Sequence, residues 1–466
     1  MSGTPDRHHC DEFSRSTLLR RAAAEAGNGL PAIEPGMPAP AGTGLDRRRF
    51  LSRTLGAALT VYGASALGPR LLDEGIARAA ATGGAGRRVL VSIFAPGGWD
   101  ALSLLSPVGD PRYRKLRSTL AFKPGDGPVF SSDRRLHWHP SLAPLARLHA
   151  RGRLTVFPAI GYSHPDQSHF TSRHFWEVGA LDPQAGTGWL GRLLDVVGDN
   201  ENAMQGLSLD GALLPSLATA RVPVATLSSP ADYGFDSHNV WDVPGELLEE
   251  AIGSLGAASA DPDPVLALAG RTIEQSHSLH RQLGRFVGKD GQVHITPKAK
   301  YPETDFGRRL SGLAALLDAN FPIRAAALTG PGSYDTHADQ QGPLQDGAKQ
   351  IAEGLAAFQA DLERRGVAGR VLTLVWSEFG RRAQQNESNG TDHGAAGVAF
   401  LMGTNVRHQM VGEFPGLTRG LDADGNLKAT VDFRSVYASL VEQWFAVDAA
   451  RILPDARSLP RPRLVA

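Results

Sequence analysis

Acidic and histidine side chains recur in the last third of the 466-residue chain, in an arrangement that could hold a divalent metal. They lie in three short polar segments and are Asp335 with His337, then Glu378, then His393. Carboxylates and imidazoles are common ligands of divalent cations when separate loops bring them together. The alternative interpretation is that they are ordinary polar loop residues. We treat these four side chains as candidate metal ligands.

A further polar segment, from Gly161 to Phe170, lies between an apolar run and the start of a helical pattern. A serine at a helix N-terminus, here Ser168, is often only a cap. The same position suits a nucleophile or a substrate ligand, because the helix dipole and a neighbouring metal would stabilise negative charge there. Both interpretations of Ser168 remain open, and His169 beside it is a candidate substrate ligand.

The spacing of apolar residues indicates which elements position these side chains. Buried strands are predicted for Val89–Phe94, Leu154–Phe157, Ile323–Leu328, Val371–Trp376 and Val398–Met402. Between the third and fourth, apolar residues recur at helical spacing from Leu344 to Leu362, with Gly366 at the expected end. A strand, a helix and a second strand in this order predict a right-handed parallel crossover. The predicted fold class is α/β, with a mainly parallel sheet sandwiched by helices.

In such a sheet, the ligand crevice lies beyond the carboxyl ends of the strands. The loop from Pro96 to Asp100 follows the first predicted strand. Each loop with a candidate ligand likewise follows or precedes another predicted strand. We therefore expect all of these loops at one edge of the sheet. Residues from about 190 to 320 contain Pro-rich turns and helical patterns such as Val265 to Val287, and we predict a helical insertion or cap over the crevice.

The N-terminal region has the layout of a twin-arginine export signal. Arg47 and Arg48 precede a moderately apolar run from Leu55 to Leu67, too short to span a bilayer, and small residues follow it. We predict a disordered extension at 1–45, a twin-arginine signal peptide at 46–81 and one domain at 82–466. The predicted partner is the twin-arginine translocation machinery, and the predicted location is periplasmic or secreted.

The charge balance argues against broad electrostatic binding. The chain has 48 basic and 48 acidic side chains; residues 1–79 contain 10 and 8 of them, which leaves 38 and 40. Such a near-neutral protein has no broad attraction for nucleic acid or anionic lipid. The single cysteine, Cys10, lies in the removed segment, so we expect neither a disulfide nor a thiolate ligand in the mature chain. We also expect no transmembrane segment there.

The order of motifs along the chain resembles the exported family known as domain of unknown function 1501. The matching segments are Gly97-Gly98-Trp99-Asp100, Gly109 to Tyr113, Leu136 to Leu145, Ser168-His169-Phe170, Tyr334 to His337, Ser377 to Arg381, Gly390 to Gly394, and Val431 to Tyr437. That family resembles the alkaline phosphatase and sulfatase superfamily in fold. The resemblance implies an alkaline phosphatase-like domain with divalent metal ions, two in number and drawn from zinc, manganese, magnesium and calcium.

Carried over by position, the resemblance implies a role for several residues. Asp100 would bind a metal, Ser168 would be the nucleophile and Arg381 would contact an anionic group, while the four ligands named above would complete the metal sites. Two departures are visible in the sequence. Ala101 follows Asp100 where a nucleophile is common, and Ser377-Glu378 lacks the histidine of the usual pair.

Two functions of different class are compatible with the sequence. The first is an exported metal-dependent hydrolase of phosphate or sulfate esters, which would act on a small anionic ester. The second is a non-catalytic periplasmic metal-binding or scaffold protein of the same fold, because one fold hosts unrelated functions.

Overall fold

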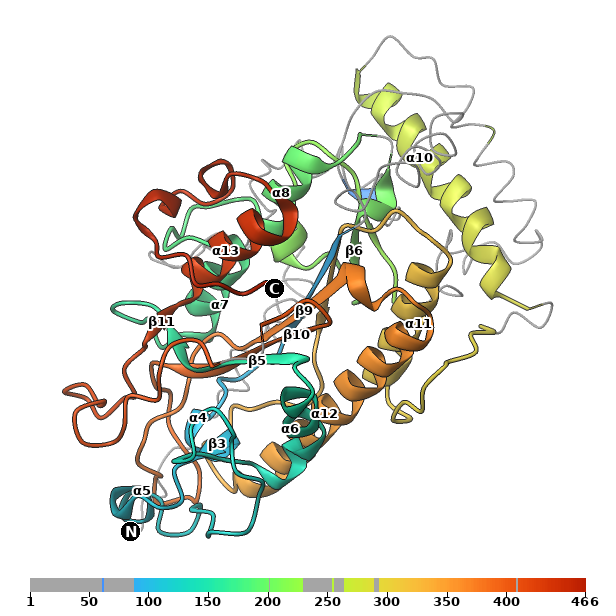
Figure 1. The fold of residues 1–466 in the computed structure, drawn as a ribbon. Coiled ribbons are helices and arrows are strands. Elements are labelled where there is room, and N and C mark those ends of the chain that lie inside the picture. The colour runs from blue at the N-terminus through green and yellow to red at the C-terminus, as the bar shows by residue number, and fades with distance from the viewer. Residues whose placement is uncertain are drawn as a thin grey trace, which may run out of the picture. The chain divides into compact units, whose positions relative to one another are not determined.

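Nine strands of the described residues form one sheet through the centre of the structure (Figure 1). The computed structural model describes residues 61–62, 88–200, 202–228, 254, 264–288, 293–407 and 410–466, all within the unit Ala39–Ala466. In spatial order the strands are β1 (Val61–Tyr62), β7 (Val224–Thr226), β6 (Gly206–Ser208), β8 (Ala325–Thr329), β2 (Val89–Phe94), β9 (Val371–Trp376), β10 (Gly397–Gly403), β5 (Leu154–Gly161) and β11 (Val431–Asp432). Neighbours from β7 to β9 are parallel, whereas β10 is antiparallel to both β9 and β5.

The central strands are buried on both faces, which explains their continuous apolar sequences. In β2, Val89, Val91 and Ile93 belong to one apolar cluster, and Leu90 and Phe94 belong to another. Successive side chains of a strand point to opposite faces, so a strand covered on both sides needs an apolar residue at nearly every position.

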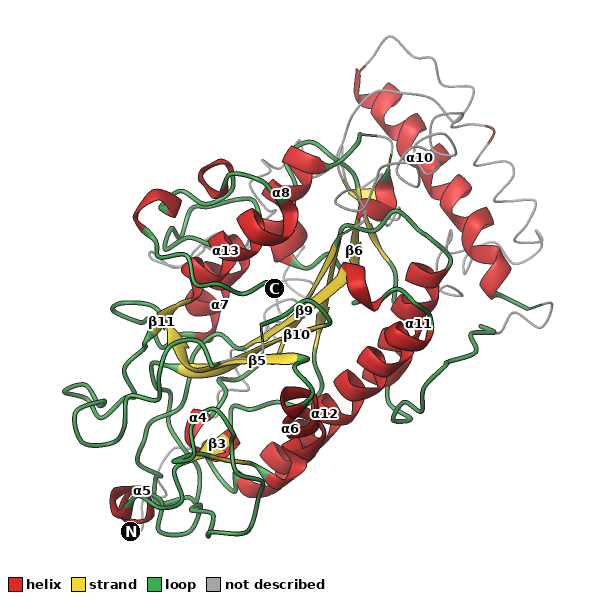
Figure 2. Cartoon of the chain, viewed as in Figure 1, coloured by secondary structure: helices red, strands yellow, loops and turns green. Residues whose placement is uncertain are grey.

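Helices cover both faces of this sheet (Figure 2). One layer consists of α6 (Ala143–Ala150), α11 (Asp305–Asp318) and α12 (Gln341–Arg364), and the other of α7 (His169–Val178), α8 (Trp189–Val197) and α13 (Phe433–Phe445). The remaining elements are α4 (Ala101–Leu104), α5 (Pro111–Leu116), α10 (Pro264–Leu283), the paired strands β3 (Leu105–Ser106) and β4 (His137–Trp138), and 3-10 turns at Pro140–Leu142, Ala203–Gln205, Pro215–Leu217, Gly284–Phe286, Ala368–Arg370, Ala449–Arg451 and Ala456–Ser458.

The predicted fold class is confirmed, and most predicted elements are present. β2 and β9 have the predicted bounds, and α12 contains the predicted helix and is followed by Gly366 at φ +75°. α12 connects β8 to β9, and both strands run parallel to β2 between them. β5 is longer than predicted. Its Pro158 lies at an irregularity in the pairing with β10, where a residue without an N–H is tolerated.

The segment predicted as an insertion or cap, about 190–320, contributes to the main layers where it is described. β6 and β7 extend the sheet, and Phe306 and Leu310 of α11 face Gly354 of α12. These elements therefore differ from the prediction, because they belong to the core of the fold. Strands of only three residues are too short to show an apolar pattern in the sequence.

The predicted extension (1–45) and signal peptide (46–81) lie outside the described residues, apart from β1, which pairs antiparallel with β7. Among the helices that are described, none is both long and apolar enough to cross a membrane.

Candidate metal centre

The polar segments meet at one edge of the sheet, as predicted. β8, β9 and β5 all end at this edge, and the segments that follow them carry Asp335, Glu378 and His169 respectively. β10 runs the opposite way, so its first residue lies at the same edge and is preceded by His393. An isolated bridge between His393 and Arg381 fixes this segment beside the loop after β9.

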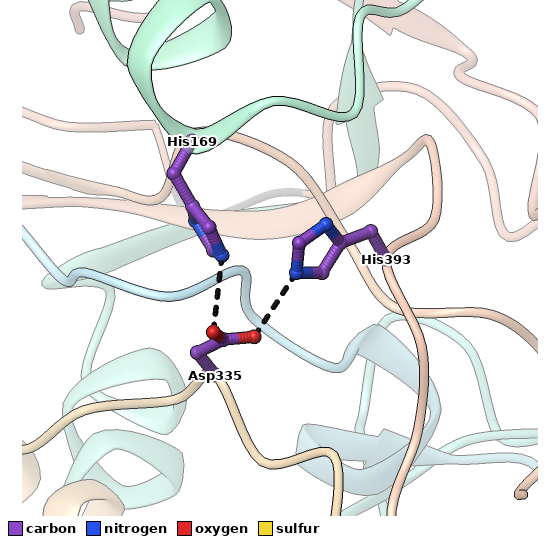
Figure 3. A group of neighbouring side chains, drawn as sticks. All are labelled: His169, Asp335 and His393. Carbon is purple, nitrogen blue, oxygen red and sulfur yellow. Dashed lines mark hydrogen bonds and ion pairs between the residues drawn. The ribbon is translucent and has the colours of Figure 1, made fainter. Parts of the chain in front are cut away.

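Within the described residues, one group of potential metal ligands is present: His169, Asp335 and His393 (Figure 3). Their ligand atoms all lie within 4.8 Å of one another. His169 Nε2 is 3.3 Å from Asp335 Oδ2, and His393 Nε2 is 3.0 Å from Asp335 Oδ1. Between 20% and 28% of each side chain is exposed, so the group borders solvent.

The residues of this group fit a metal ion. His169 Nε2 is buried and makes no well-aligned hydrogen bond, although buried polar atoms are normally satisfied; the Asp335 carboxylate, 3.3 Å away, is its ion-pair partner. Zinc bound tetrahedrally at about 2.0–2.1 Å separates its ligand atoms by roughly 3.4 Å. The distances of 3.3 and 3.0 Å from the two imidazoles to different oxygens of Asp335 are of this size. Two imidazoles and one carboxylate suit zinc, manganese or iron better than magnesium or calcium, which prefer ligand sets made of oxygen.

Both imidazoles are held at their other nitrogen. His169 Nδ1 is 2.7 Å from Glu378 Oε1, and His393 Nδ1 is 2.8 Å from the Gln167 carbonyl oxygen. An acceptor at Nδ1 requires the proton there, which leaves the Nε2 lone pair of a neutral ring for a metal. The Phe379 ring also packs against both imidazoles, at centroid distances of 4.8 and 4.9 Å.

The acidic surroundings change the protonation of His169. Burial by itself would lower its pKa, but Asp335 and Glu378 outweigh burial and raise the pKa to about 9. Without a metal the ring is therefore protonated at neutral pH. Metal binding has to displace that proton, because only the neutral ring is a ligand.

Glu378 is buried and fixed by the loop after β2. Its Oε1 accepts a hydrogen bond from Gly97 N at 2.9 Å, and its Oε2 accepts one from Ser377 Oγ at 2.8 Å. Gly97 has φ +107°, and a Cβ there would lie 2.3 Å from Asp335 N, so the close approach requires glycine. Burial would raise the pKa of Glu378, but the His169 contact and the backbone donors lower it. The sequence predicted Glu378 as a metal ligand. In the structure its carboxylate instead contacts Nδ1 of the candidate ligand His169.

Arg381 is fully buried beside Asp335. Its Nη1 donates to Asp335 Oδ1 at 2.9 Å and to the Gly97 carbonyl at 3.1 Å, and its Nε and Nη2 donate to Thr391. Burial alone would raise the pKa of Asp335, but the surrounding imidazoles hold it well below its usual range. Predicted to contact substrate, Arg381 instead makes its hydrogen bonds within the protein.

His337 borders the group on a more exposed side, with 39% of its side chain accessible. Its Nε2 is 3.0 Å from Asp335 Oδ1 and 3.1 Å from His393 Nε2, and its Nδ1 is 3.2 Å from Asp392 Oδ1. The hydrogen bond to Asp335 is the main cause of its raised pKa. His337 remains a candidate ligand because its Nε2 faces the same carboxylate.

Asp100 occupies a different environment. Its carboxylate forms two hydrogen bonds with Arg117, at 2.6 and 2.9 Å, and accepts others from Ser103 Oγ, Gln340 Nε2 and Leu102 N. Both Asp100 and Arg117 are almost completely buried. Burial would raise the pKa of Asp100, but Arg117 lowers it. Asp100 is thus one half of a buried ion pair, outside the ligand group, whereas the sequence predicted a metal ligand.

Ser168 is the N-cap of α7. Its Oγ accepts a long hydrogen bond, 3.5 Å, from Thr171 N, and the side chain is partly exposed. Sequence reasoning left cap and nucleophile open for this residue, and the cap contact is present. It assigned His169 to the substrate, yet the structure groups that ring with Asp335 and His393. The Gly161 to Phe170 segment was the available signal, because it follows a strand at the same edge.

Most of this site lies in a segment that matches a known family. Residues 278–455 match the family described as "Protein of unknown function (DUF1501)". Over these residues the chain is similar to that family. The predicted resemblance is thereby confirmed. The matched segment includes Asp335 and His393 but begins after His169, and the search of curated proteins found no match.

Solved structures with some likeness to the chain include three bacterial proteins. The zinc complex of the C-terminal periplasmic domain of EcEptC from Escherichia coli has 10% identity and a TM-score of 0.36, over 85% of this chain and 89% of that one. An alkaline phosphatase superfamily protein from Vibrio parahaemolyticus has 10% identity and a TM-score of 0.36, over 92% and 75%. The PsFucS1 sulfatase from Pseudoalteromonas sp. has 12% identity and a TM-score of 0.30, over 81% and 71%. The superpositions are loose.

We expect substitutions in the group to weaken zinc binding in a graded way. Glu378→Gln should weaken it by about 10–100-fold, the range for a side chain that orients a ligand, and His169→Asn should weaken it more because it removes a ligand. Competition titration against a chromophoric chelator measures both. His164→Asn is the matched control, since His164 is exposed and its φ of +53° suits asparagine. Wild-type affinity in His169→Asn would remove this residue from the centre.

Asp100→Asn tests the buried ion pair. It leaves the Arg117 charge buried without a counter-ion, so we expect a loss of about 3–5 kcal/mol in the free energy of unfolding by denaturant. Asp305→Asn, which removes the partner of the exposed Arg308, should cost less than about 1 kcal/mol. Zinc stoichiometry should not change in Asp100→Asn. Lost zinc with unchanged stability would instead make Asp100 a ligand.

Proposed function

We propose that the protein is an exported metal-dependent hydrolase of phosphate or sulfate esters. The observation that carries the proposal is the group of His169, Asp335 and His393, in which each imidazole is fixed at Nδ1 and turns Nε2 toward the carboxylate. Three protein ligands beside solvent leave a position for a further ligand, which is typical of catalytic rather than structural metal sites.

The charges around the group favour an anionic substrate when a cation is bound. Asp335 and Glu378 contribute two negative charges and Arg381 contributes one positive charge, while imidazoles bind metals in the neutral form. Without a metal, protonated His169 brings the sum of these charges to zero; a divalent cation that displaces this proton would bring it to +1. It would also polarise an ester oxygen as a Lewis acid.

Ser168 is the hydroxyl that we assign as nucleophile. It directly precedes His169 at the N-terminus of α7, where the helix dipole favours negative charge on oxygen. Its long hydrogen bond to Thr171 N restrains it only weakly.

A second function, non-catalytic metal binding or a scaffold role, is favoured by two contacts. Ser168 caps α7, and Arg381 bonds to Asp335 and to the backbone. Both residues would then have structural roles, and a bound cation would stabilise the sheet edge without turnover.

Ser168→Ala separates the two functions. For a nucleophile we expect hydrolysis of activated phosphate or sulfate esters to be abolished while fold and metal content persist, because one hydroxyl is removed with little packing. A cap predicts a loss of about 1 kcal/mol in stability and a modest change in activity. Ser163→Ala, an exposed serine of the same segment, is the control. Wild-type protein that hydrolyses no phosphomonoester, phosphodiester, sulfate or phosphonate ester with any plausible metal would favour the second function.

Export is tested separately from catalysis. The double variant Arg47→Lys, Arg48→Lys should stay in the cytoplasm, since the twin-arginine machinery reads the paired guanidinium groups and not positive charge alone. Cell fractionation and immunoblotting measure the location. The same double change at the upstream pair Arg20 and Arg21 should leave export intact. Periplasmic delivery of the first variant would show that the signal does not act through this pathway.

A further inference from the structure

One buried tyrosine hydroxyl connects the surroundings of both imidazoles. Tyr162 directly follows β5, and only 5% of the residue is exposed. Its hydroxyl oxygen lies 2.8 Å from Ser172 Oγ and 3.0 Å from the backbone nitrogen of Asp166. Neither Ser172 nor Asp166 belongs to the group of potential metal ligands. Any role of Tyr162 at the metal centre therefore acts through the residues that these two contact.

The direction of the hydrogen bonds follows from the number of protons. Ser172 has one hydroxyl proton and donates it to the Glu378 carbonyl oxygen at 2.9 Å. Tyr162 is then the donor to Ser172 Oγ, which at 2.8 Å is closer than the other acceptor of its proton, the Asp166 carbonyl at 3.3 Å, and its oxygen accepts from the Asp166 N–H. The result is one directed chain from Asp166 N–H through Tyr162 and Ser172 to the Glu378 carbonyl. Burial raises the pKa of the Tyr162 hydroxyl, so the proton that the chain requires is retained.

One branch of this chain reaches His169. Ser172 lies three residues after His169 on α7, so the two side chains share a face of the helix. Both contact the same residue: Ser172 Oγ bonds to the Glu378 carbonyl, and His169 Nδ1 bonds to its Oε1. The first turn of α7 is thus attached to Glu378 at two points, which fixes the direction of the His169 ring.

The other branch reaches His393. The Asp166 N–H bond to Tyr162 holds the loop between β5 and α7. The next residue in that loop is Gln167, whose carbonyl oxygen accepts a hydrogen bond from His393 Nδ1. A change in the path of this loop would move the acceptor that fixes the tautomer and orientation of His393.

We propose that Tyr162 is a positioning residue of the metal centre, whose hydroxyl orients His169 through Ser172 and Glu378, and His393 through the loop of Asp166 and Gln167. The inference rests on the metal centre of the proposed function, but not on turnover. It assigns to Tyr162 an effect on both ligands, which a residue that only supports α7 would not have.

The test compares two tyrosines and two serines that are all buried. Tyr162→Phe removes the hydroxyl and keeps the ring, and Ser172→Ala breaks the next step. Tyr437→Phe is the matched tyrosine control, because Tyr437 donates at 3.0 Å to the Trp176 carbonyl of the same helix α7 without touching Glu378. Ser435→Ala is the serine control, because that buried hydroxyl has no hydrogen-bond partner.

Two measurements are made on each full-length variant. Zinc affinity is obtained by chelator competition, and the ring nitrogen and Nδ1 proton signals of ¹⁵N-labelled histidine are recorded in metal-free protein. We expect Tyr162→Phe and Ser172→Ala to bind zinc about tenfold more weakly. Both should shift the His169 signals, and Tyr162→Phe should also shift those of His393. The two controls should leave affinity and signals unchanged.

Two results would overturn the proposal: wild-type affinity and signals in Tyr162→Phe, or equal effects in Tyr437→Phe. If Tyr162→Phe does not fold, Ser172→Ala still decides whether the chain to Glu378 orients His169. Wild-type protein that binds zinc without hydrolysing any ester would contradict the proposed hydrolase and leave the positioning role standing. If the wild-type protein binds no zinc, the metal centre fails, and the metal-free signals still decide whether Tyr162 orients the two rings.

Discussion

The site depends on one carboxylate, that of Asp335, and on the groups that share it. Oδ1 lies within 3.0 Å of Arg381 Nη1, His337 Nε2 and His393 Nε2, and Oδ2 lies 3.3 Å from His169 Nε2. Without this negative charge, the fully buried Arg381 guanidinium would lose its carboxylate partner, which is strongly unfavourable. Asp335 therefore has a structural function that would persist even if no metal were bound. Because Oδ1 already has three partners, Oδ2 is the oxygen with more room for a cation.

The close packing of charged groups at the sheet edge is made possible by backbone geometry. The loop after β2 turns at Gly97, whose N–H binds Glu378 and whose carbonyl accepts from Arg381. The backbone of Gly97 thus contacts both Glu378 and Arg381, which lie in the loop after β9. Since the buried side chains of Glu378 and Arg381 each make several hydrogen bonds, this part of the site is held in place before any ligand is present. A rigid ligand set raises metal affinity, because little ordering remains to be done on binding.

The sequence predicted the fold well because burial on both faces leaves a direct signature: continuous apolar runs for β2 and β9 and a helical repeat for α12. It also placed the polar segments at the correct edge, because parallel strands end on the same side. It could not assign individual roles. Asp100 and Glu378 are both acids that directly or closely follow a central strand, and what separates them is a distant partner, Arg117 in one case and His169 in the other. No local pattern encodes such a pairing.

The C-terminal segment from Val431 to Tyr437, identified in the sequence without a chemical role, shows how packing far along the chain supports the same site. Trp176 of α7 lies between Trp376 at the end of β9 and Phe433, stacked at centroid distances of 5.2 and 4.4 Å. Aromatic pairs of this kind contribute about 0.5–1.5 kcal/mol beyond the area they bury. They fix the second half of α7 against the end of β9, the strand that precedes Glu378, while the bonds of Ser172 and His169 fix its first turn. A helix held at both ends cannot rotate about its axis without losing one set of contacts. Apolar stacking in the core therefore supports the position of α7 from which the polar contacts at the sheet edge direct His169 Nε2 toward Asp335.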